Sequence, residues 1–235
     1  MTVAPCSDDS VPTVDELRTR VTQMQGRPAT QPVRTHPALA GLLQLQTGSS
    51  YGVESASLAT LLLAGPSADG LWCGIVGSAE LGLEAAAAAG VELSRTILVP
   101  DPGDAWLEVT AALIDVLGIV VVRPPGRVSE GDAARLAARL RQRGSILVAW
   151  GDWPRCEARL GLSDVEWVGL GIGHGHLQAR QATVEVSRGT TPGGTSRERS
   201  EWGTVSTRLW LPDVDLRIRP VAEEPARLPR LRSVS

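Results

Sequence analysis

The chain alternates between short apolar runs and longer segments whose apolar residues recur at helical spacing. Apolar runs at 49–53, 71–76, 96–99, 119–122 and 145–150 have the length and content of strands. Segments at 57–64, 79–89, 102–117 and 130–143 have helical periodicity and separate these runs. This alternation predicts βαβ units, in which helices cover both faces of a mainly parallel sheet.

Local signals place the helix ends. Gly65-Pro66 is expected to stop the first helix and Gly90 the second. Asp101 is expected to cap the third, with Pro102 at its first position and Gly118 beyond its end. Ser129 caps the fourth, which Gly144 ends.

The pattern changes after residue 150. Residues 176–187 and 205–211 read as two long strands with no helix between them, so antiparallel strands are expected to extend the sheet. The connection at 188–203 is rich in Gly, Ser, Thr and Arg and is expected to be a loop. The predicted organisation is an acidic segment with a helix and linker at 1–33, an α/β core at 34–219 and a flexible basic tail at 220–235.

The N-terminal helix is signalled by a capping box, Thr13-x-x-Glu16. Its apolar stripe is expected to pack either on the chain's own core or on a neighbouring subunit. The second interpretation predicts self-association. The stripe consists of Val14, Leu17, Val21 and Met24.

Composition narrows the chemistry. The net charge is −3, and all 23 residues counted as Lys plus Arg are arginines. A chain without lysine has no ammonium group for a phosphate-binding loop or a Schiff base. Three scattered cysteines argue against a disulfide framework and a zinc site, and no apolar run is long enough to predict a membrane span.

Several phrases resemble the RecA/RadA recombinase core, over roughly residues 38–219. Residues 72–76 with 90–101 are similar to its second βαβ unit, 115–122 to its Walker B strand and 146–152 to its sensor strand. Within that superfamily the chain looks like the actinobacterial ImuA-like proteins. The phrases that carry this resemblance are 35–42, 98–102, 122–125, 151–154 and 209–213.

The resemblance implies a RecA-like fold and an accessory role in DNA-damage-induced mutagenesis. The expected partner is an ImuB-type homologue of the Y-family polymerases, with indirect links to an error-prone C-family polymerase and the replication clamp. The implied location is the cytoplasm, at the nucleoid when DNA is damaged. The loops that grip DNA in recombinases correspond to 124–129 and 153–170, which are short or poor in charge here.

The expected ATP site is degenerate. A phosphate-binding loop needs G-x-x-x-x-G-K-[ST], but the matching stretch begins Gly52-Val53-Glu54-Ser55 and lacks the lysine. Ser57 is either a relic of the magnesium-binding hydroxyl or a helix N-cap. Arg123 follows the Walker B strand where a carboxylate would hold Mg²⁺. Glu80 lies one residue from the register of the water-activating glutamate and is otherwise an exposed glutamate at a helix start. We therefore expect no ATP hydrolysis, no catalytic residue and no bound cofactor or metal; a regulator that senses nucleotide without hydrolysing it remains an alternative.

A serine hydrolase is the alternative enzyme class that sequence motifs suggest. Residues 48–52 match the G-x-S-x-G nucleophile elbow, and Asp152 and His174 follow Ser50 in the order of that fold. His174 and His176 also form an H-x-H pair, which reads as a turn entering a strand or as part of a metal site without a third ligand.

Two further regions are candidates for binding. Arginines on and after the fourth helix form a solvated basic face or a patch for DNA or a partner. They are Arg135, Arg139, Arg143, Arg155 and Arg159. The C-terminal region is either solvated or a segment that folds on a partner, and the resemblance favours it for ImuB contact. Its candidate residues are Arg217, Arg219, Leu228, Arg230 and Leu231.

Overall fold

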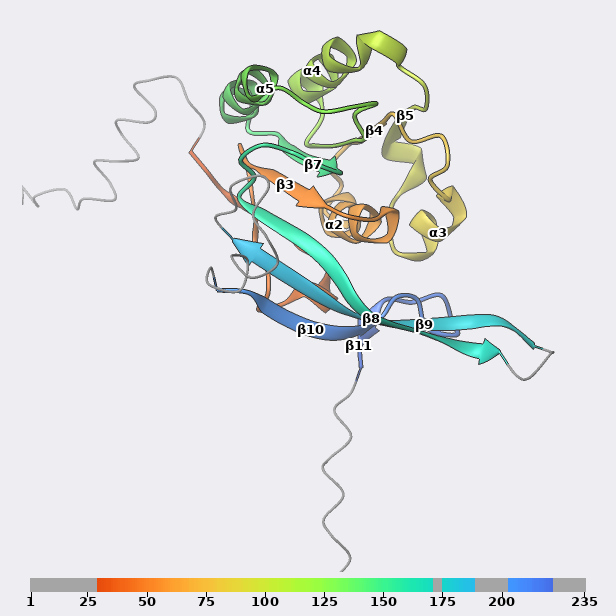
Figure 1. Ribbon diagram of the computed structural model, residues 1–235. Coiled ribbons are helices and arrows are strands. Elements are labelled where there is room, and N and C mark those ends of the chain that lie inside the picture. Colours follow the sequence, from red (N-terminus) through yellow and green to blue (C-terminus); the bar gives the residue numbers. More distant parts are fainter. Residues whose placement is uncertain (1–28, 171–174, 189–202, 222–235) are drawn as a thin grey trace, which may run out of the picture.

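The computed structural model describes residues 29–170, 175–188 and 203–221. Among these residues, nine strands form one sheet in the order β11–β10–β9–β8–β3–β7–β6–β4–β5 (Figure 1). The strands are β3 (Ser50–Val53), β4 (Cys73–Val76), β5 (Thr96–Val99), β6 (Ile119–Val122), β7 (Ile146–Trp150), β8 (Ala158–Leu170), β9 (Gly175–Arg188), β10 (Val205–Trp210) and β11 (Arg219–Pro220). A separate antiparallel pair, β1 (Pro32–Val33) and β2 (Leu45–Gln46), precedes them.

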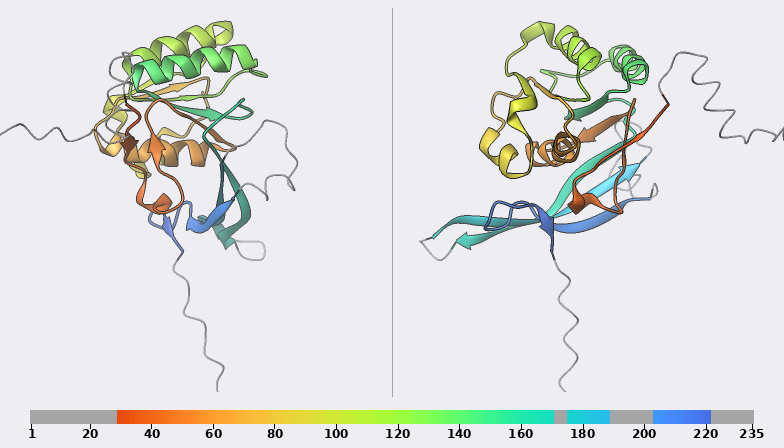
Figure 2. Two further views of the ribbon diagram at one scale, coloured as in Figure 1. Left: turned by 90° about the vertical axis from the view of Figure 1, so that its left-hand side faces the viewer. Right: turned by 180° about the vertical axis from the view of Figure 1, so that it is seen from behind.

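The sheet is parallel from β8 to β5 and antiparallel from β8 to β11. Helices α2 (Ala56–Ala68) and α3 (Leu83–Ala88) lie on one side of the parallel part, and α4 (Trp106–Val116) and α5 (Glu130–Arg143) lie on the other (Figures 1 and 2). Short 3-10 turns occur at Pro37–Leu39, Leu93–Arg95 and Gly103–Ala105. The predicted α/β class, with antiparallel strands added at the end, is confirmed.

Alternation along each strand builds two cores. In β6, Ile119 and Val121 pack in the cluster that contains α2, whereas Val120 and Val122 pack in the cluster that contains α4 and α5. All four side chains are buried, and burying a Val or Ile side chain contributes about 1.5–3 kcal/mol. The apolar runs that form β3, β4 and β6 are therefore strands covered on both faces.

Helix boundaries match the sequence signals in one case and differ in three. The hydroxyl of Ser129 accepts a hydrogen bond from the Asp132 N–H, and Gly144 is left-handed at φ 71°, so α5 has the predicted ends. By contrast, α2 continues through Pro66 to Ala68. A proline in the last turn removes only one hydrogen bond, and the buried apolar side chains of the helix hold it in place in spite of this loss.

The other two corrections concern helix starts. α3 occupies only Leu83–Ala88 instead of 79–89, because the chain first makes a turn in which the Leu81 N–H reaches the Ser78 carbonyl. α4 begins at Trp106 instead of at residue 102, because a 3-10 turn at Gly103–Ala105 comes before it.

The long strand β8 was not predicted, because residues 153–170 were interpreted as a loop. β8 spans Ala158–Leu170 and pairs with β3 on one side and β9 on the other. Its distal half and the start of β9 extend beyond the helices as a two-stranded ribbon (Figure 1). This ribbon exposes Val165, Trp167, Val168 and Leu177.

Gly65 in α2 permits a close crossing of two chain segments. A Cβ atom at this position would lie 2.6 Å from the Arg34 carbonyl oxygen and 2.7 Å from the His36 nitrogen. Both neighbours are backbone atoms, which cannot rotate away as a side chain can. The segment that leads from β1 into the core therefore packs directly on the backbone of α2.

A tightly bonded turn joins β10 to β11. The buried Asp213 carboxylate accepts hydrogen bonds from the Asp215 and Arg217 N–H groups, both at 2.9 Å, and from Arg219 Nε at 2.5 Å. The Arg219 guanidinium, helped by the Arg217 N–H, lowers the pKa of Asp213 below its ordinary value of 3.8. This carboxylate therefore holds residues 211–219 in one conformation.

We expect Gly65→Ala to lower the free energy of unfolding by about 2 kcal/mol, because the added methyl group collides with backbone atoms. The matched control is Gly131→Ala in α5, where the nearest atom to a new Cβ is the Ser129 hydroxyl at 3.7 Å. That change should leave stability unchanged or raise it by about 0.5 kcal/mol, because alanine favours a helix. Urea denaturation measures both, and equal effects would contradict the close crossing.

We expect Asp213→Asn to destabilise the protein at neutral pH, because the amide loses the charged partner of Arg219. A carboxyl whose native pKa is lowered stabilises the fold above its unfolded pKa and loses this contribution as the pH falls through the native pKa. The difference between wild type and Asp213→Asn should therefore be full at pH 7 and shrink below pH 3.8. Thermal melting at pH 7 and below pH 3.8 tests this. Asp215→Asn is the control, because Asp215 is exposed and contributes to the turn through its backbone.

Candidate functional site

The connection between β3 and α2 is the first place to look for a ligand, because P-loop proteins bind phosphates there. It contains two residues, Glu54 and Ser55. The Ser55 hydroxyl caps α2 by accepting a hydrogen bond from the Leu58 N–H at 3.4 Å. The interpretation of Ser57 as the N-cap is therefore wrong by two residues, and the Ser57 hydroxyl instead accepts a hydrogen bond from Arg180 at 2.7 Å.

Arg159 explains why Gly52 is a glycine. The guanidinium of Arg159, on the neighbouring strand β8, lies across Gly52, where a Cβ would come within 3.1 Å of its Cζ atom. It donates to the carbonyl oxygens of Gly151 at 3.0 Å and Trp153 at 3.1 Å. Gly52 thus makes room for an arginine that fastens the end of β7, and the Glu54 carboxylate lies against Gly161 of β8.

Arg123 occupies the position that follows the predicted Walker B strand. Its guanidinium forms an ion pair with Glu80 and lies 4.5 Å from the centre of the Trp150 ring at the end of β7. Glu80 is not at a helix start, because α3 begins three residues later at Leu83. Arg123, in contact with both Glu80 and Trp150, therefore closes the carboxyl ends of β4, β6 and β7.

A polar hollow of about 280 Å³ lies beside this closed edge. Its charged lining residues are Asp101 and Arg123, and the rest are glycines and prolines at the ends of β4, β5 and β6. The connections after β4 and β6 leave toward opposite faces of the sheet at this point, which is where doubly wound sheets bind ligands. Sequence reasoning did not identify this hollow.

The position of Ser50 contradicts the serine-hydrolase hypothesis. A nucleophile elbow follows a strand, whereas Ser50 is the first residue of β3, is buried and has its hydroxyl 3.5 Å from the Arg155 carbonyl. Ser50 pairs with Leu147 and Val53 with Trp150, so Ser50 and Asp152 lie at opposite ends of neighbouring parallel strands. His174 lies outside the described residues.

The second histidine of the H-x-H pair, His176, is exposed on β9. Within the described part of the chain, no group of three His, Cys, Asp or Glu side chains is arranged to hold a metal ion. The same residues contain no helix long and apolar enough to cross a membrane.

The predicted basic patch is largely neutralised. Arg135 pairs with Asp132 at 3.1 Å, Arg139 and Arg143 both reach Asp115 at 3.1 Å, and Arg155 pairs with Glu130 at 3.0 Å. Arg159 donates to backbone carbonyls. Sequence reasoning missed these pairings because Asp115 belongs to α4, a different helix from Arg139 and Arg143.

The predicted binding segments at the termini fall only partly within the structure. Val14, Leu17, Val21, Met24, Leu228, Arg230 and Leu231 lie outside the described residues. Arg219 is not a free cation, because it bonds to Asp213 and lies 5.8 Å from the centre of the Trp210 ring. Arg217 is exposed in the same turn and contributes its backbone N–H.

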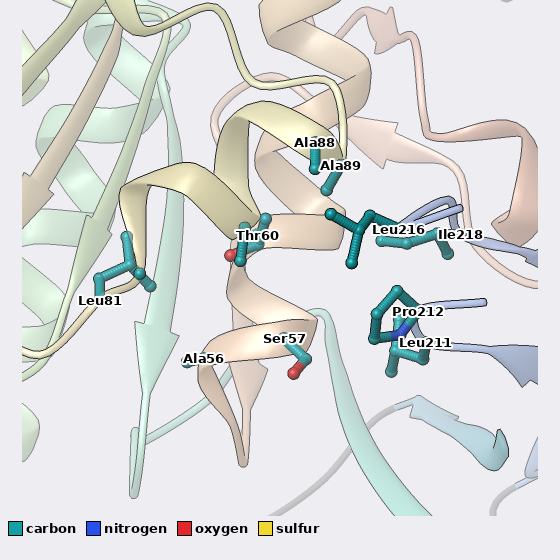
Figure 3. Close-up of a pocket in the computed structure, with 12 residues that line it drawn as sticks. Ala56, Ser57, Thr60, Leu81, Ala88, Ala89, Leu211, Pro212, Leu216 and Ile218 are labelled. Carbon is teal, nitrogen blue, oxygen red and sulfur yellow. The ribbon is translucent and has the colours of Figure 1, made fainter. Parts of the chain in front are cut away.

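An apolar pocket of about 130 Å³ lies between α2, α3 and the turn at 211–218 (Figure 3). A cavity of about 150 Å³ holds a benzene molecule, so this pocket has the size of one bulky apolar side chain. Its lining residues are Ala56, Ser57, Thr60, Leu81, Gly82, Ala85, Ala88, Ala89, Leu211, Pro212, Leu216 and Ile218. None of these side chains carries a charge.

The turn that borders this pocket also presents apolar side chains to solvent. Val214 is 63% exposed and Leu216 is 56% exposed, and Leu216 adopts a left-handed conformation with φ 60°. A non-glycine residue in that conformation is strained and persists only when its surroundings hold it, as Asp213 does here. We call the pocket with Val214 and Leu216 the docking face. The sequence signal for it was the alternation of acidic and apolar residues in Asp213-Val214-Asp215-Leu216, which was not used.

Arg180 connects the docking face to the ribbon. Its side chain is half-buried, with Nε donating to the Leu211 carbonyl and Nη2 to the Ser57 hydroxyl, both at 2.7 Å. Its Cζ atom also lies 5.3 Å from the centre of the Trp167 ring on β8. One guanidinium thus links β8, β9, α2 and the turn.

Comparison with known proteins places this architecture. The crystal structure of the RadB recombinase superposes with a TM-score of 0.50 over 74% of this chain and 91% of that one, at 16% identity, which shows a shared RecA-like fold. The Mycobacterium tuberculosis protein Rv3395c is 36% identical over 169 residues, covering 68% of this chain and 82% of that protein. The family model of the MT3502 N-terminal domain matches residues 37–155. The chain therefore belongs to the MT3502 family.

Proposed function

We propose that this protein is a non-catalytic adaptor that binds an ImuB-type homologue of the Y-family polymerases during DNA-damage-induced mutagenesis. In this role it would link that homologue to an error-prone C-family polymerase and the replication clamp, in the cytoplasm at damaged nucleoids. The observation that carries the adaptor role is the docking face, a firmly held turn that exposes Val214 and Leu216 beside an uncharged pocket. The identity of the partner rests on the resemblance to ImuA-like proteins.

The carboxyl edge of the sheet supports a role without ATP turnover. A two-residue connection offers few backbone N–H groups to a triphosphate, and Glu54 adds a negative charge there. Arg123 would repel Mg²⁺ from the position that a Walker B carboxylate occupies in active ATPases. Glu80, the carboxylate beside this position, is already paired with Arg123, which also lies against Trp150.

The docking face suits a protein partner better than a nucleic acid. Hot spots of protein interfaces are often aromatic side chains in well-packed, fully desolvated pockets, and this uncharged pocket has the size of one such side chain. DNA binding depends on cations that can neutralise phosphates. The arginines of the predicted patch are mostly engaged with carboxylates of the chain itself.

A nucleotide-sensing regulator is the second candidate, favoured by the polar hollow beside Arg123. Calorimetric titration with ATP, with and without Mg²⁺, separates the two. Magnesium-independent nucleotide binding that is lost in Asp101→Ala would favour the regulator.

We expect the purified protein to release no phosphate from Mg·ATP above background. The control is Arg123→Ala, which alters the closed edge. A contaminating ATPase would give the same rate in both preparations. Turnover that the wild type shows and Arg123→Ala lacks would place a working site at this edge and contradict the adaptor role.

We expect Leu216→Asp to weaken binding of the co-expressed ImuB-type protein at least about tenfold, the equivalent of about 1.4 kcal/mol, because a charge replaces an apolar contact. Leu216 is exposed, so the fold should survive, and circular dichroism checks this. The control is Val116→Asp at the end of α4, which is 74% exposed and outside the docking face. Equal affinity of Leu216→Asp and wild type would remove the docking face from the interface, and no binding by the wild type would overturn the proposed partner.

A further inference from the structure

The outer strand of the parallel sheet is unusually open. β5 is the last strand in the sheet order, and no described residue pairs with its outer edge. Ile97 is 37% exposed and Leu98 is 39% exposed, on opposite faces of the strand, whereas every residue of β3, β4 and β6 is buried. Parallel sheets normally bury both faces, so this strand is incomplete as it stands.

The backbone of β5 fixes which residue can bond outward. The Val99 carbonyl accepts a hydrogen bond from the Gly77 N–H at 2.9 Å, so the polar groups of Val99 point inward, toward β4. The N–H and C=O of one residue in a strand point to the same side, and this side alternates along the strand. The N–H and C=O of Leu98 therefore point outward, where an antiparallel strand could exchange two hydrogen bonds with them.

The charges around β5 are self-complementary. The strand itself carries none, but Arg95 lies three residues before Leu98 and Asp101 lies three residues after it, and both are exposed. If Leu98 faces Leu98 of a second copy in an antiparallel pair, Arg95 of each copy lies opposite Asp101 of the other. A parallel pairing would instead place like charges together, which is destabilising.

We propose that β5 pairs with β5 of a second copy of this chain, antiparallel and centred on Leu98, to form a two-fold dimer with one continuous sheet. Leu98 of each copy packs beside its equivalent on one face, and Ile97 packs against Val99 of the other copy on the opposite face. The interface uses the same patch on both copies, as a two-fold axis requires.

Charge exchange tests this pairing in the absence of any partner protein. In Arg95→Asp, both Arg95–Asp101 pairs across the interface become pairs of acidic residues. In Asp101→Arg, both become pairs of arginines. Each single variant should weaken dimerisation at least about tenfold in sedimentation velocity, since two ion pairs of up to about 1 kcal/mol each are lost and replaced by repulsion. The matched control is Arg141→Asp on the exposed side of α5, which should leave dimerisation unchanged.

Recovery of dimerisation when the two substitutions are combined is the decisive measurement. The double variant Arg95→Asp/Asp101→Arg should dimerise like the wild type, because both pairs return with exchanged signs. An equimolar mixture of the two single variants should form mixed dimers, since each acidic copy then faces a basic one. A wild type that stays monomeric at all concentrations, single variants that dimerise normally, or single variants without recovery would each overturn the proposal. These readouts do not involve the docking face or the ImuB-type partner, so their failure is distinguishable from failure of the adaptor role.

Discussion

The two-residue connection between β3 and α2 is the constraint on which the carboxyl edge of this sheet depends. In a P-loop protein a longer loop wraps around phosphates between strand and helix. Here Ser55 caps α2 immediately after the strand, Gly52 is covered by Arg159, and Arg123 turns to Trp150 and Glu80. Side chains of the protein itself therefore occupy much of the edge at which doubly wound sheets bind ligands, while the layers behind it keep the RecA-like arrangement.

Local sequence patterns predicted the parallel core because its strands are continuous apolar runs between helices with clear stop signals. Ser129 and Gly144 set the ends of α5 by bonds within their own turn, so sequence alone sufficed there. β8 could not be predicted in this way. Its polar and glycine residues become a strand through pairing with β9, which follows it closely in sequence, and with β3, which lies far before it. The contacts of the candidate site could not be predicted either, because they join separate elements. Asp115 of α4 neutralises Arg139 and Arg143 of α5, and Trp150 of β7 contacts Arg123, which follows β6.

Large apolar side chains face solvent mainly at additions to, or borders of, the parallel core, and Val116 at the end of α4 is also exposed. The ribbon of β8 and β9, the turn at 211–218 and the strand β5 each expose large apolar side chains. Exposed apolar side chains that gather on one surface can mark contact with other macromolecules. The proposed adaptor role would need such surfaces on a scaffold rigid enough to hold them in place, and the doubly covered sheet has this character.

Arg180 gives this scaffold a mechanical property. Its guanidinium is partly withdrawn from water and has bonds to the turn carbonyl of Leu211 and the Ser57 hydroxyl, with Trp167 alongside. If the turn shifted away, this cation would lose a partner without regaining full hydration, which carries a large free-energy penalty. The ribbon, α2 and the turn at 211–218 are thereby held together as one body, so that a displacement of the ribbon at Trp167 is passed on to the pocket instead of being absorbed by a hinge.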